Sequence, residues 1–250
     1  MQNKWYSLFK AILGPPLVVW NRPRIYGAEH IPEDGPVLLI SNHQAVMDSF
    51  YLPLMVRRQI TFPAKKEYFT GTGLSGRIQK FFFSSVGQVP IDRESKDAGS
   101  HLLETASEIL GRGDVFGIYI EGTRSPDGRI FKGRTGAARI AMETGAPVVL
   151  VGMIGSRDAN PIGTKIPRPA KVRINISEPI DPHSWAREHG FDPDSREVMR
   201  PFTDMCTARL AEMVGVEYVD VYASEVKKHL EQHGTYPPGT EPNRDAGKGR

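Results

Sequence analysis

Two side chains that could share a proton, His43 and Asp48, stand five positions apart in the stretch SNHQAVMDSF, residues 41–50. An aspartate that accepts the proton-bearing ring nitrogen of a histidine fixes its tautomer, and the other nitrogen can then take a proton from a hydroxyl or from water. On a straight α-helix, residues five apart are offset by about 140°, so the two can meet only if His43 lies on a non-helical entry. Spacing alone favours a simpler interpretation, in which Ser41 or Asn42 caps a helix and the pair occurs by chance.

A second group of polar residues surrounds the end of an apolar run, in YIEGTRSPDGRIFKGRTG, residues 119–136. Hydroxyls, exposed backbone amides and guanidinium groups are donors that bind phosphate oxygens, and a glycine permits close backbone approach. The segment lacks the Gly-Lys-Ser/Thr ending of a Walker loop. The alternative is a basic, well-solvated loop. The candidate phosphate-binding residues are Glu121, Gly122, Thr123, Arg124 and Ser125, followed by Arg129, Lys132 and Arg134.

Polar residues follow a third expected strand, in VGQVPIDR, residues 86–93, where Asp92 and Arg93 come directly after the apolar positions. Alone, Arg93 would be interpreted as a salt-bridged surface arginine. Catalytic and ligand-binding groups, however, gather at the carboxyl ends of strands in α/β sheets. Its place at a strand end lets Arg93 join the same cleft as His43 and the loop that begins at Glu121.

Short apolar runs alternate with helical patterns after residue 24, which predicts an α/β domain with a mixed, mostly parallel sheet covered by helices. The expected strands are residues 24–30, 37–41, 60–66, 87–91, 115–121, 147–155 and 171–177. The expected helices are residues 45–57, 73–83, 97–111, 134–144 and 196–214. In helix 97–111, leucines and isoleucines recur at three-and-four spacing and Gly111 ends the pattern, as in an amphipathic helix.

Length and composition favour one domain over two. The chain has 250 residues, of which 39% are hydrophobic and 24% charged, enough to bury a full core. We expect this domain to cover residues 23–235. The single cysteine, Cys206, excludes an internal disulfide framework and suits a reducing compartment. The last fifteen residues, 236–250, have almost no apolar content and are predicted to be disordered.

Two segments are candidates for contact with a membrane, although no continuous apolar run approaches the ~20 residues that span a bilayer. Residues 1–22 show helix-like apolar spacing, broken by Gly14-Pro15-Pro16, and predict an amphipathic, membrane-associating helix. The alternative is a helix packed on the domain's own core. Residues 51–83 mix six cations and one acid with bulky apolar side chains, which suits an anionic lipid surface. Nucleic acid and a merely solvated basic face are the alternatives there.

Taken together, these motifs resemble the four ordered sequence blocks of the lysophosphatidic acid acyltransferase (1-acyl-sn-glycerol-3-phosphate acyltransferase) family of glycerolipid acyltransferases. The matching positions are His43 and Asp48 for HxxxxD, Gly87 to Arg93 for the second block, Glu121 to Ser125 for EGTRS, and Pro147 for the proline that leads a strand. Each block is short, but four of them in order are specific. Two departures, Pro90 in place of an aromatic residue and the lack of a second proline after Pro147, concern acceptor and acyl-chain preference.

The resemblance implies transfer of an acyl group, without a covalent enzyme intermediate, from a thioester of coenzyme A or acyl carrier protein to the free hydroxyl of lysophosphatidic acid. The product would be phosphatidic acid. The resemblance also implies that His43 acts as general base and that Asp48 orients it. The residues implied to hold the phosphate and glycerol of the acceptor are Arg93, Glu121, Gly122, Thr123, Arg124 and Ser125.

The same resemblance implies no metal and no cofactor beyond the acyl carrier. We expect a peripheral protein on the cytoplasmic face of the cell membrane, with anionic lipid rather than nucleic acid as its surface partner. Three alternatives stay open. The acceptor could be glycerol 3-phosphate or another lysophospholipid, the chemistry could be His/Asp hydrolysis of a thioester or phosphate ester, or the domain could bind lipid without catalysis.

Overall fold

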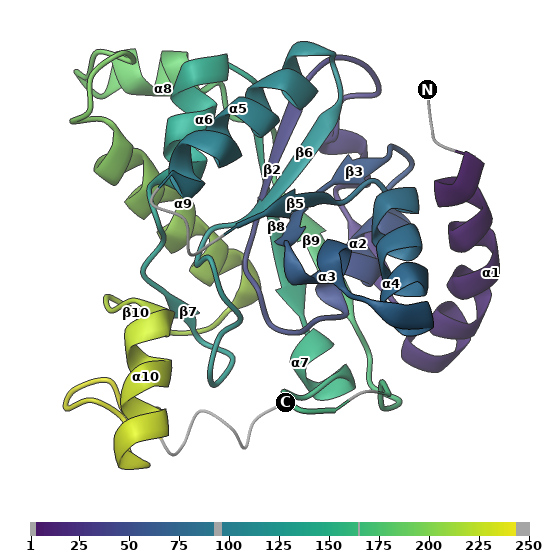
Figure 1. Cartoon of the computed structure of the whole chain (residues 1–250). Helices are drawn as coiled ribbons and strands as arrows, with labels where there is room; N and C mark the ends of the chain where they lie inside the picture. Colours follow the sequence, from purple (N-terminus) through teal and green to yellow (C-terminus); the bar gives the residue numbers. More distant parts are fainter. Residues whose placement is uncertain (1–3, 93–96, 165, 244–250) are drawn as a thin grey trace.

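A six-stranded sheet organises the computed structural model, which describes residues 4–92, 97–164 and 166–243 (Figure 1). The strand order is β1 (Arg24–Tyr26), β9 (Arg173–Ile176), β8 (Val148–Ile154), β2 (Val37–Ser41), β6 (Val115–Tyr119) and β3 (Ile60–Thr61). The last four of these strands are mutually parallel, β9 runs antiparallel to β8, and β1 is parallel to β9. The predicted single α/β domain with a mostly parallel sheet is confirmed.

Helices cover both faces of this sheet, which is why its central strands are apolar throughout rather than alternating. In β2, Leu38 and Ile40 join the core formed with α5 (Ala98–Gly111), α6 (Gly136–Thr144), α8 (Pro182–Glu188) and α9 (Met199–Val214). Val37 and Leu39 face the opposite core, which α2 (Asp48–Met55) contributes to. Consecutive strand residues point to opposite faces, so one strand supplies both cores.

The predicted strand 60–66 is wrong as a single element. It divides at Phe62 into β3 and β4 (Pro63–Lys65), and β4 pairs in parallel with β5 (Val89–Ile91) in a separate two-stranded sheet. Proline has no backbone N–H to donate to a ladder, which suits Pro63 to the start of a strand. Two short helices, α3 (Glu67–Thr70) and α4 (Gly73–Ser85), connect β4 to β5.

Several elements, most of them short, were not expected from the sequence. Two residues each form β7 (Ile130–Phe131) and β10 (Tyr218–Val219), which pair in parallel. The helix α10 (Ala223–His233) follows β10, while α7 (Ser156–Ala159) follows β8 and a 3-10 turn, η1 (Ala28–His30), follows β1. With two to four residues, β7, β10, α7 and η1 are too short for a hydrophobic period to stand out, whereas α10 has eleven residues and lies where the sequence predicted no element.

The helix α1 (Lys4–Asn21) continues through Gly14, Pro15 and Pro16, where the sequence indicated a break. Both prolines are exposed, so water can satisfy the carbonyls that they leave without an amide donor. Gly14 is buried against α2, since a Cβ there would lie 2.7 Å from Leu54 Cδ1. Within the described residues, no helix combines the length and the apolar character needed to cross a lipid bilayer.

The disorder expected for residues 236–250 stays a prediction, and the structure describes this segment as far as residue 243. Thr240 is buried, and the Arg129 guanidinium donates to the carbonyl oxygens of Thr240 and Glu241. The same guanidinium lies 5.8 Å from the ring centre of Tyr236. A charged donor thus compensates for the low apolar content of this segment. Residues 244–250 lie outside the described residues.

We predict that Gly117→Ala in β6 lowers the free energy of unfolding by about 1–3 kcal/mol through overpacking. A Cβ at this position would clash with the ring of Phe62, which is fully buried and cannot move aside. Urea denaturation measures the change. Gly111→Ala is the control, because nothing lies within 4 Å of its added methyl group. A loss of stability as large in the control would contradict this explanation.

Candidate active site

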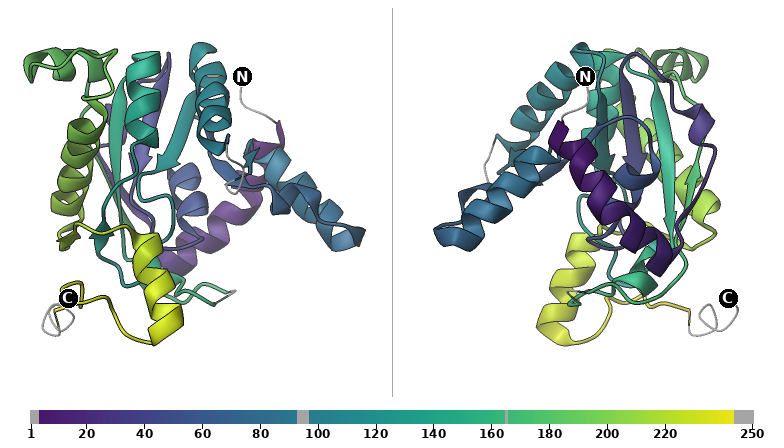
Figure 2. Two further views of the ribbon diagram at one scale, coloured as in Figure 1. Left: turned by 60° about the vertical axis from the view of Figure 1, so that its left-hand side comes forward. Right: turned by 90° about the vertical axis from the view of Figure 1, so that its right-hand side faces the viewer.

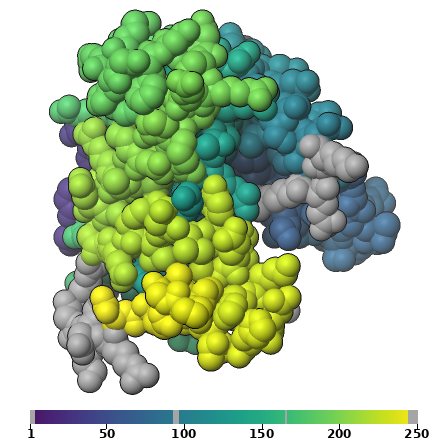
Figure 3. Space-filling view, turned by 90° about the vertical axis from the view of Figure 1, so that its left-hand side faces the viewer, coloured from purple at the N-terminus to yellow at the C-terminus, as the bar shows by residue number. Residues whose placement is uncertain are grey.

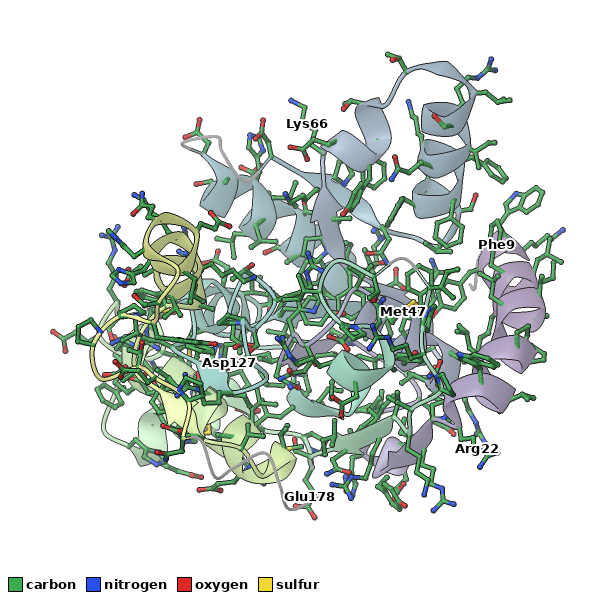
Figure 4. All side chains as sticks on the ribbon, turned by 90° about the horizontal axis from the view of Figure 1, so that it is seen from below. Phe9, Arg22, Met47, Lys66, Asp127 and Glu178 are labelled. Carbon is green, nitrogen blue, oxygen red and sulfur yellow. The ribbon has the colours of Figure 1, made fainter. Side chains whose placement is uncertain are left out.

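The polar side chains singled out in the sequence gather where β2 and β6 end. Figure 4 views this edge of the sheet from below, with Met47 and Asp127 labelled in the segments that follow these two strands. After β2 the chain is not helical until α2 begins at Asp48. His43 therefore lies on an extended entry, and its Nδ1 is 3.0 Å from Asp48 Oδ2. The sequence spacing allowed His43 and Asp48 to meet only if His43 was not helical, and the structure fulfils this condition.

The Asp48 carboxylate is fully buried and one of its oxygens collects three donors. Besides the His43 ring, Oδ2 accepts the backbone N–H of Gln44 at 2.7 Å and that of Ala45 at 2.9 Å. Hydrogen bonds from backbone amides stabilise an ionised carboxylate in a place where water cannot. The turn therefore wraps around Asp48, and the same oxygen orients the imidazole.

The proposed capping roles of Ser41 and Asn42 are wrong. The residue that precedes α2 is Met47, and it makes no side-chain capping bond. Asn42 instead pairs with β8, donating from Nδ2 to the carbonyl of Met153 at 3.0 Å and accepting its N–H at 2.7 Å. The Ser41 hydroxyl donates to the carbonyl of Val151 in the same strand. These bonds secure the chain just before His43.

Tyr119, the last residue of β6, packs against one face of the His43 imidazole. The sequence did not single it out as a site residue. Its ring stacks on His43 with centroids 3.8 Å apart and planes 10° apart, and also on Phe62 with centroids 5.2 Å apart. Its hydroxyl lies 2.8 Å from Ser49 Oγ, beside Asp48 in the chain. Burial raises the pKa of the phenol well above its ordinary value, so it stays neutral. The only sequence signal was its position, two residues before Glu121.

Glu121 is buried behind the histidine, with an exposed fraction of 1%. Its two carboxylate oxygens accept the backbone N–H of His43 and that of Phe131, each at 3.0 Å. Burial raises the pKa of this carboxyl to about 8, while these two hydrogen bonds and the Lys227 ammonium lower it. The sequence assigned Glu121 to acceptor binding, whereas its contacts are with the backbone that carries His43.

The residues after Glu121 divide between the pocket and the interior of the loop. Thr123 and Arg124 line a pocket together with His43. Ser125 is buried and organises the loop, because its hydroxyl donates to the carbonyl of Arg129, and its own N–H donates to the carbonyl of His43 at 2.7 Å. Gly122 adopts a φ of 70°, a conformation that favours glycine.

Two pockets meet at His43 and Tyr119. The first, of about 230 Å³, has aromatic and basic walls that include Phe50, Tyr68, Phe83, Lys65 and Arg124. The second, of about 450 Å³, has apolar walls from Ile91, Leu102, Ile118 and Ile120, with Gly122 and Arg134 also lining it. The predicted site residue Arg93 lies outside the described residues. Ile91, two positions before it, lines the second pocket, so β5 leads to this site.

The site and the fold match known acyltransferases. The family model described as Acyltransferase matches residues 22–154, just over half of the chain, and we conclude that the chain belongs to this family. The resemblance seen in the four sequence blocks is thereby confirmed. The matched region holds both members of the His43–Asp48 pair and the whole EGTRS loop.

Individual relatives agree with the family. The 1-acyl-sn-glycerol-3-phosphate acyltransferase BAT2 of Brassica napus is 32% identical over 62% of this chain and 44% of its own length. The chain thus spans less than half of that relative. The 1-acyl-sn-glycerol-3-phosphate acyltransferase of Bacillus subtilis is 25% identical over 76% of this chain and 87% of its own. The crystal structure of the LPA acyltransferase PlsC from Thermotoga maritima superposes with a TM-score of 0.64 at 26% identity, covering 86% of this chain and 81% of that one.

The raised pKa of Glu121 predicts that the free energy of unfolding falls as the pH rises from about 4.5 to about 8. In that window the folded protein keeps a proton that the unfolded chain has already lost, so each step up in pH favours unfolding. In Glu121→Gln this contribution disappears. We therefore expect the stability of wild type relative to Glu121→Gln to decline over this range by on the order of a few kcal/mol.

Urea denaturation of both proteins at several pH values measures this difference. Glu212→Gln on α9 serves as the control, because this carboxyl is exposed. A constant difference between wild type and Glu121→Gln across the range would show that burial does not raise the pKa of Glu121.

Proposed function

We propose that this protein transfers a fatty acyl group from an acyl thioester to the free hydroxyl of lysophosphatidic acid and so forms phosphatidic acid. The observation that carries the proposal is the His43 ring, held on buried Asp48 at 3.0 Å and located where a basic and an apolar pocket meet. A general base between two such pockets can face a phosphate-bearing acceptor on one side and an acyl chain on the other. The names of the relatives support the choice of this acceptor.

The proposed reaction uses the two ring nitrogens differently. Asp48 holds the Nδ1–H, so Nε2 takes the proton from the acceptor hydroxyl as the hydroxyl oxygen attacks the thioester carbonyl carbon. The C–O bond forms, the C–S bond breaks, and the departing thiolate receives the proton from the imidazolium. The buried Asp48 carboxylate stabilises the transient positive charge on the ring. The protein is unchanged at the end and forms no covalent bond to the acyl group.

The proposed placement of the acceptor follows the charges around the first pocket. Thr123 and Arg124 would contact the phosphate, because a guanidinium pairs well with phosphate oxygens. Arg93, outside the described residues, stays a sequence-based candidate for the same role. Glu121 and Ser125 would act indirectly, because they hold the backbone on either side of the site. The apolar second pocket would receive the acyl chain. Either coenzyme A or acyl carrier protein could carry the chain, and no metal or further cofactor takes part in the proposed reaction.

We also propose that the protein binds peripherally to the cytoplasmic face of the membrane through α1 and α4. The two helices meet at one edge of the molecule, near the start of α1 and the end of α4 (Figure 2), with Trp5 against Phe81 and Phe9 against Phe82 at ring separations of 5.1 Å. Large apolar side chains remain exposed on both helices, among them Trp5, Ile12, Trp20, Leu74, Ile78 and Phe81. Exposed apolar side chains on two helices that meet in this way suit a lipid interface.

The chemistry is tested by following thiol release from a long-chain acyl-coenzyme A or acyl carrier protein. With lysophosphatidic acid present, we expect rapid thiol release and formation of phosphatidic acid, and His43→Ala should lower the rate by at least ~100-fold, the usual value of a general base. Because the variant also loses the stacking on Tyr119 and one donor to buried Asp48, its thermal midpoint is measured alongside, and rates are compared at a temperature where both proteins are folded.

Three acceptor conditions separate the alternatives: lysophosphatidic acid, glycerol 3-phosphate and none. Thiol release without any acceptor would indicate a thioester hydrolase. A preference for glycerol 3-phosphate would identify that compound as the acceptor. No thiol release with either carrier would indicate a lipid-binding domain without catalytic activity. Wild-type rates in His43→Ala would refute the proposed mechanism.

Membrane binding is tested by flotation with vesicles of phosphatidylcholine alone or with phosphatidylglycerol. We expect wild type to float with the anionic vesicles, and Ile78→Glu to lower the bound fraction several-fold, because it places a charge on an exposed apolar side chain of α4. Gln232→Glu on α10 adds the same charge at another exposed position and should float like wild type. If the two variants float equally, or if wild type does not float, the proposal that α1 and α4 bind the membrane is refuted.

A further inference from the structure

The helix α10 reaches the active-site loop from a part of the chain outside the family match at residues 22–154. Its buried face, Ala223 and Val226, packs on Phe131 and Val219 of the small β7–β10 sheet. On the face of the molecule shown in Figure 3, the C-terminal residues in yellow pack against the rest of the domain. The helix is therefore held in place by a small core of its own.

Lys227 on this helix contacts the loop directly. Its ammonium donates to Thr123 Oγ1 at 2.9 Å, across a sequence separation of 104 residues. One turn earlier, Ser224 accepts a hydrogen bond of 2.9 Å from Arg134, which lies just past the loop. Two bonds from one helix thus hold the segment between β6 and α6.

Cations outnumber acids around this contact. Lys227 is half-buried and faces the guanidinium groups of Arg124 and Arg157, with Glu121 and Glu231 as the acids that oppose them. Burial lowers the pKa of its ammonium to about 8, and repulsion from Arg124 adds to this effect. Both oxygens of Glu121 already accept backbone amides. A group of cations brought together in this way gains stability when an anionic ligand binds among them.

The direction of the Lys227 bond decides what Thr123 can offer to a ligand. An ammonium has only donors, so it occupies a lone pair of the threonine oxygen and directs the hydroxyl hydrogen away from itself. Among the described residues, no group accepts that hydrogen. Thr123 lines the pocket with Arg124 and His43, so its hydroxyl can donate to an anion in the pocket.

We propose that Lys227 is a positioning residue for the phosphate of the acceptor, acting through the Thr123 hydroxyl and through its own positive charge. This inference rests on the function proposed above and assigns the C-terminal helix to the acceptor site. Its consequence is selectivity: Lys227 favours an acceptor that carries a phosphate over a neutral one with the same glycerol and acyl chain.

The test compares Lys227→Met with wild type on lysophosphatidic acid and on 1-monoacylglycerol, which lacks the phosphate. We expect KM for lysophosphatidic acid to rise about 10-fold or more, as for a lost charge-assisted contact, with little change in kcat or in KM for the acyl donor. Activity on 1-monoacylglycerol should not change. Lys227→Arg, which keeps the charge and a donor, should restore most of the affinity.

Two further variants separate positioning from stability. Lys228→Met, on the next and exposed position of α10, should behave as wild type. If Lys227 acts through Thr123, the double variant Lys227→Met with Thr123→Val should raise KM less than the product of the two single effects. Thermal midpoints measured alongside detect any loss of fold.

Distinct outcomes overturn the two proposals. An unchanged KM in Lys227→Met, or equal losses on both acceptors, would refute the role of Lys227 while leaving the function intact. Failure of wild type to acylate lysophosphatidic acid would refute the proposed function, and the variants would then be compared on glycerol 3-phosphate. If wild type acylates no phosphate-bearing acceptor, the role of Lys227 fails as well.

Discussion

The buried Asp48 carboxylate is the group on which the site depends. A carboxylate removed from water must find donors within the protein, and Oδ2 finds three, from the His43 ring and from the amides of Gln44 and Ala45. These bonds hold the chain between β2 and α2 in a non-helical turn, and this turn brings the His43 ring to Asp48. The position of His43 therefore follows from the bonds that gather around Asp48 Oδ2, and the backbone of His43 is held as well, by Glu121 and by the Ser125 amide.

Polar groups deeper in the protein fix this turn against the sheet. Asn42 pairs with both backbone groups of Met153 in β8, and Glu121 accepts the His43 amide from the end of β6. Tyr119 adds an aromatic face to the imidazole. Each of these contacts comes from a neighbouring strand, so the orientation of the histidine is as rigid as the sheet. An imidazole held in this way has little freedom left to lose, and such pre-organisation suits the role of general base proposed for His43.

Much of the fold could be predicted because burial leaves a local pattern. The expected strand 37–41 coincides with β2, and the expected helix 97–111 differs from α5 by one residue. Both elements are long enough for their apolar residues to show a period. The pattern did not reveal that α1 continues through Pro15 and Pro16, since that depends on the exposure of the prolines and on the contact of Gly14 with α2. Short elements such as β7 and β10 left no pattern either.

The groups that could do chemistry can be identified in the sequence, because His43, Asp48 and the EGTRS loop each follow an apolar run that had to become a strand. What each group touches depends on the folded arrangement of distant segments. This arrangement directed Glu121 toward backbone amides, placed Tyr119 on the imidazole and brought Lys227 to Thr123 across 104 residues. The physical reason is that local periodicity encodes burial, whereas a contact between distant segments depends on strand order and helix placement, which no single segment specifies.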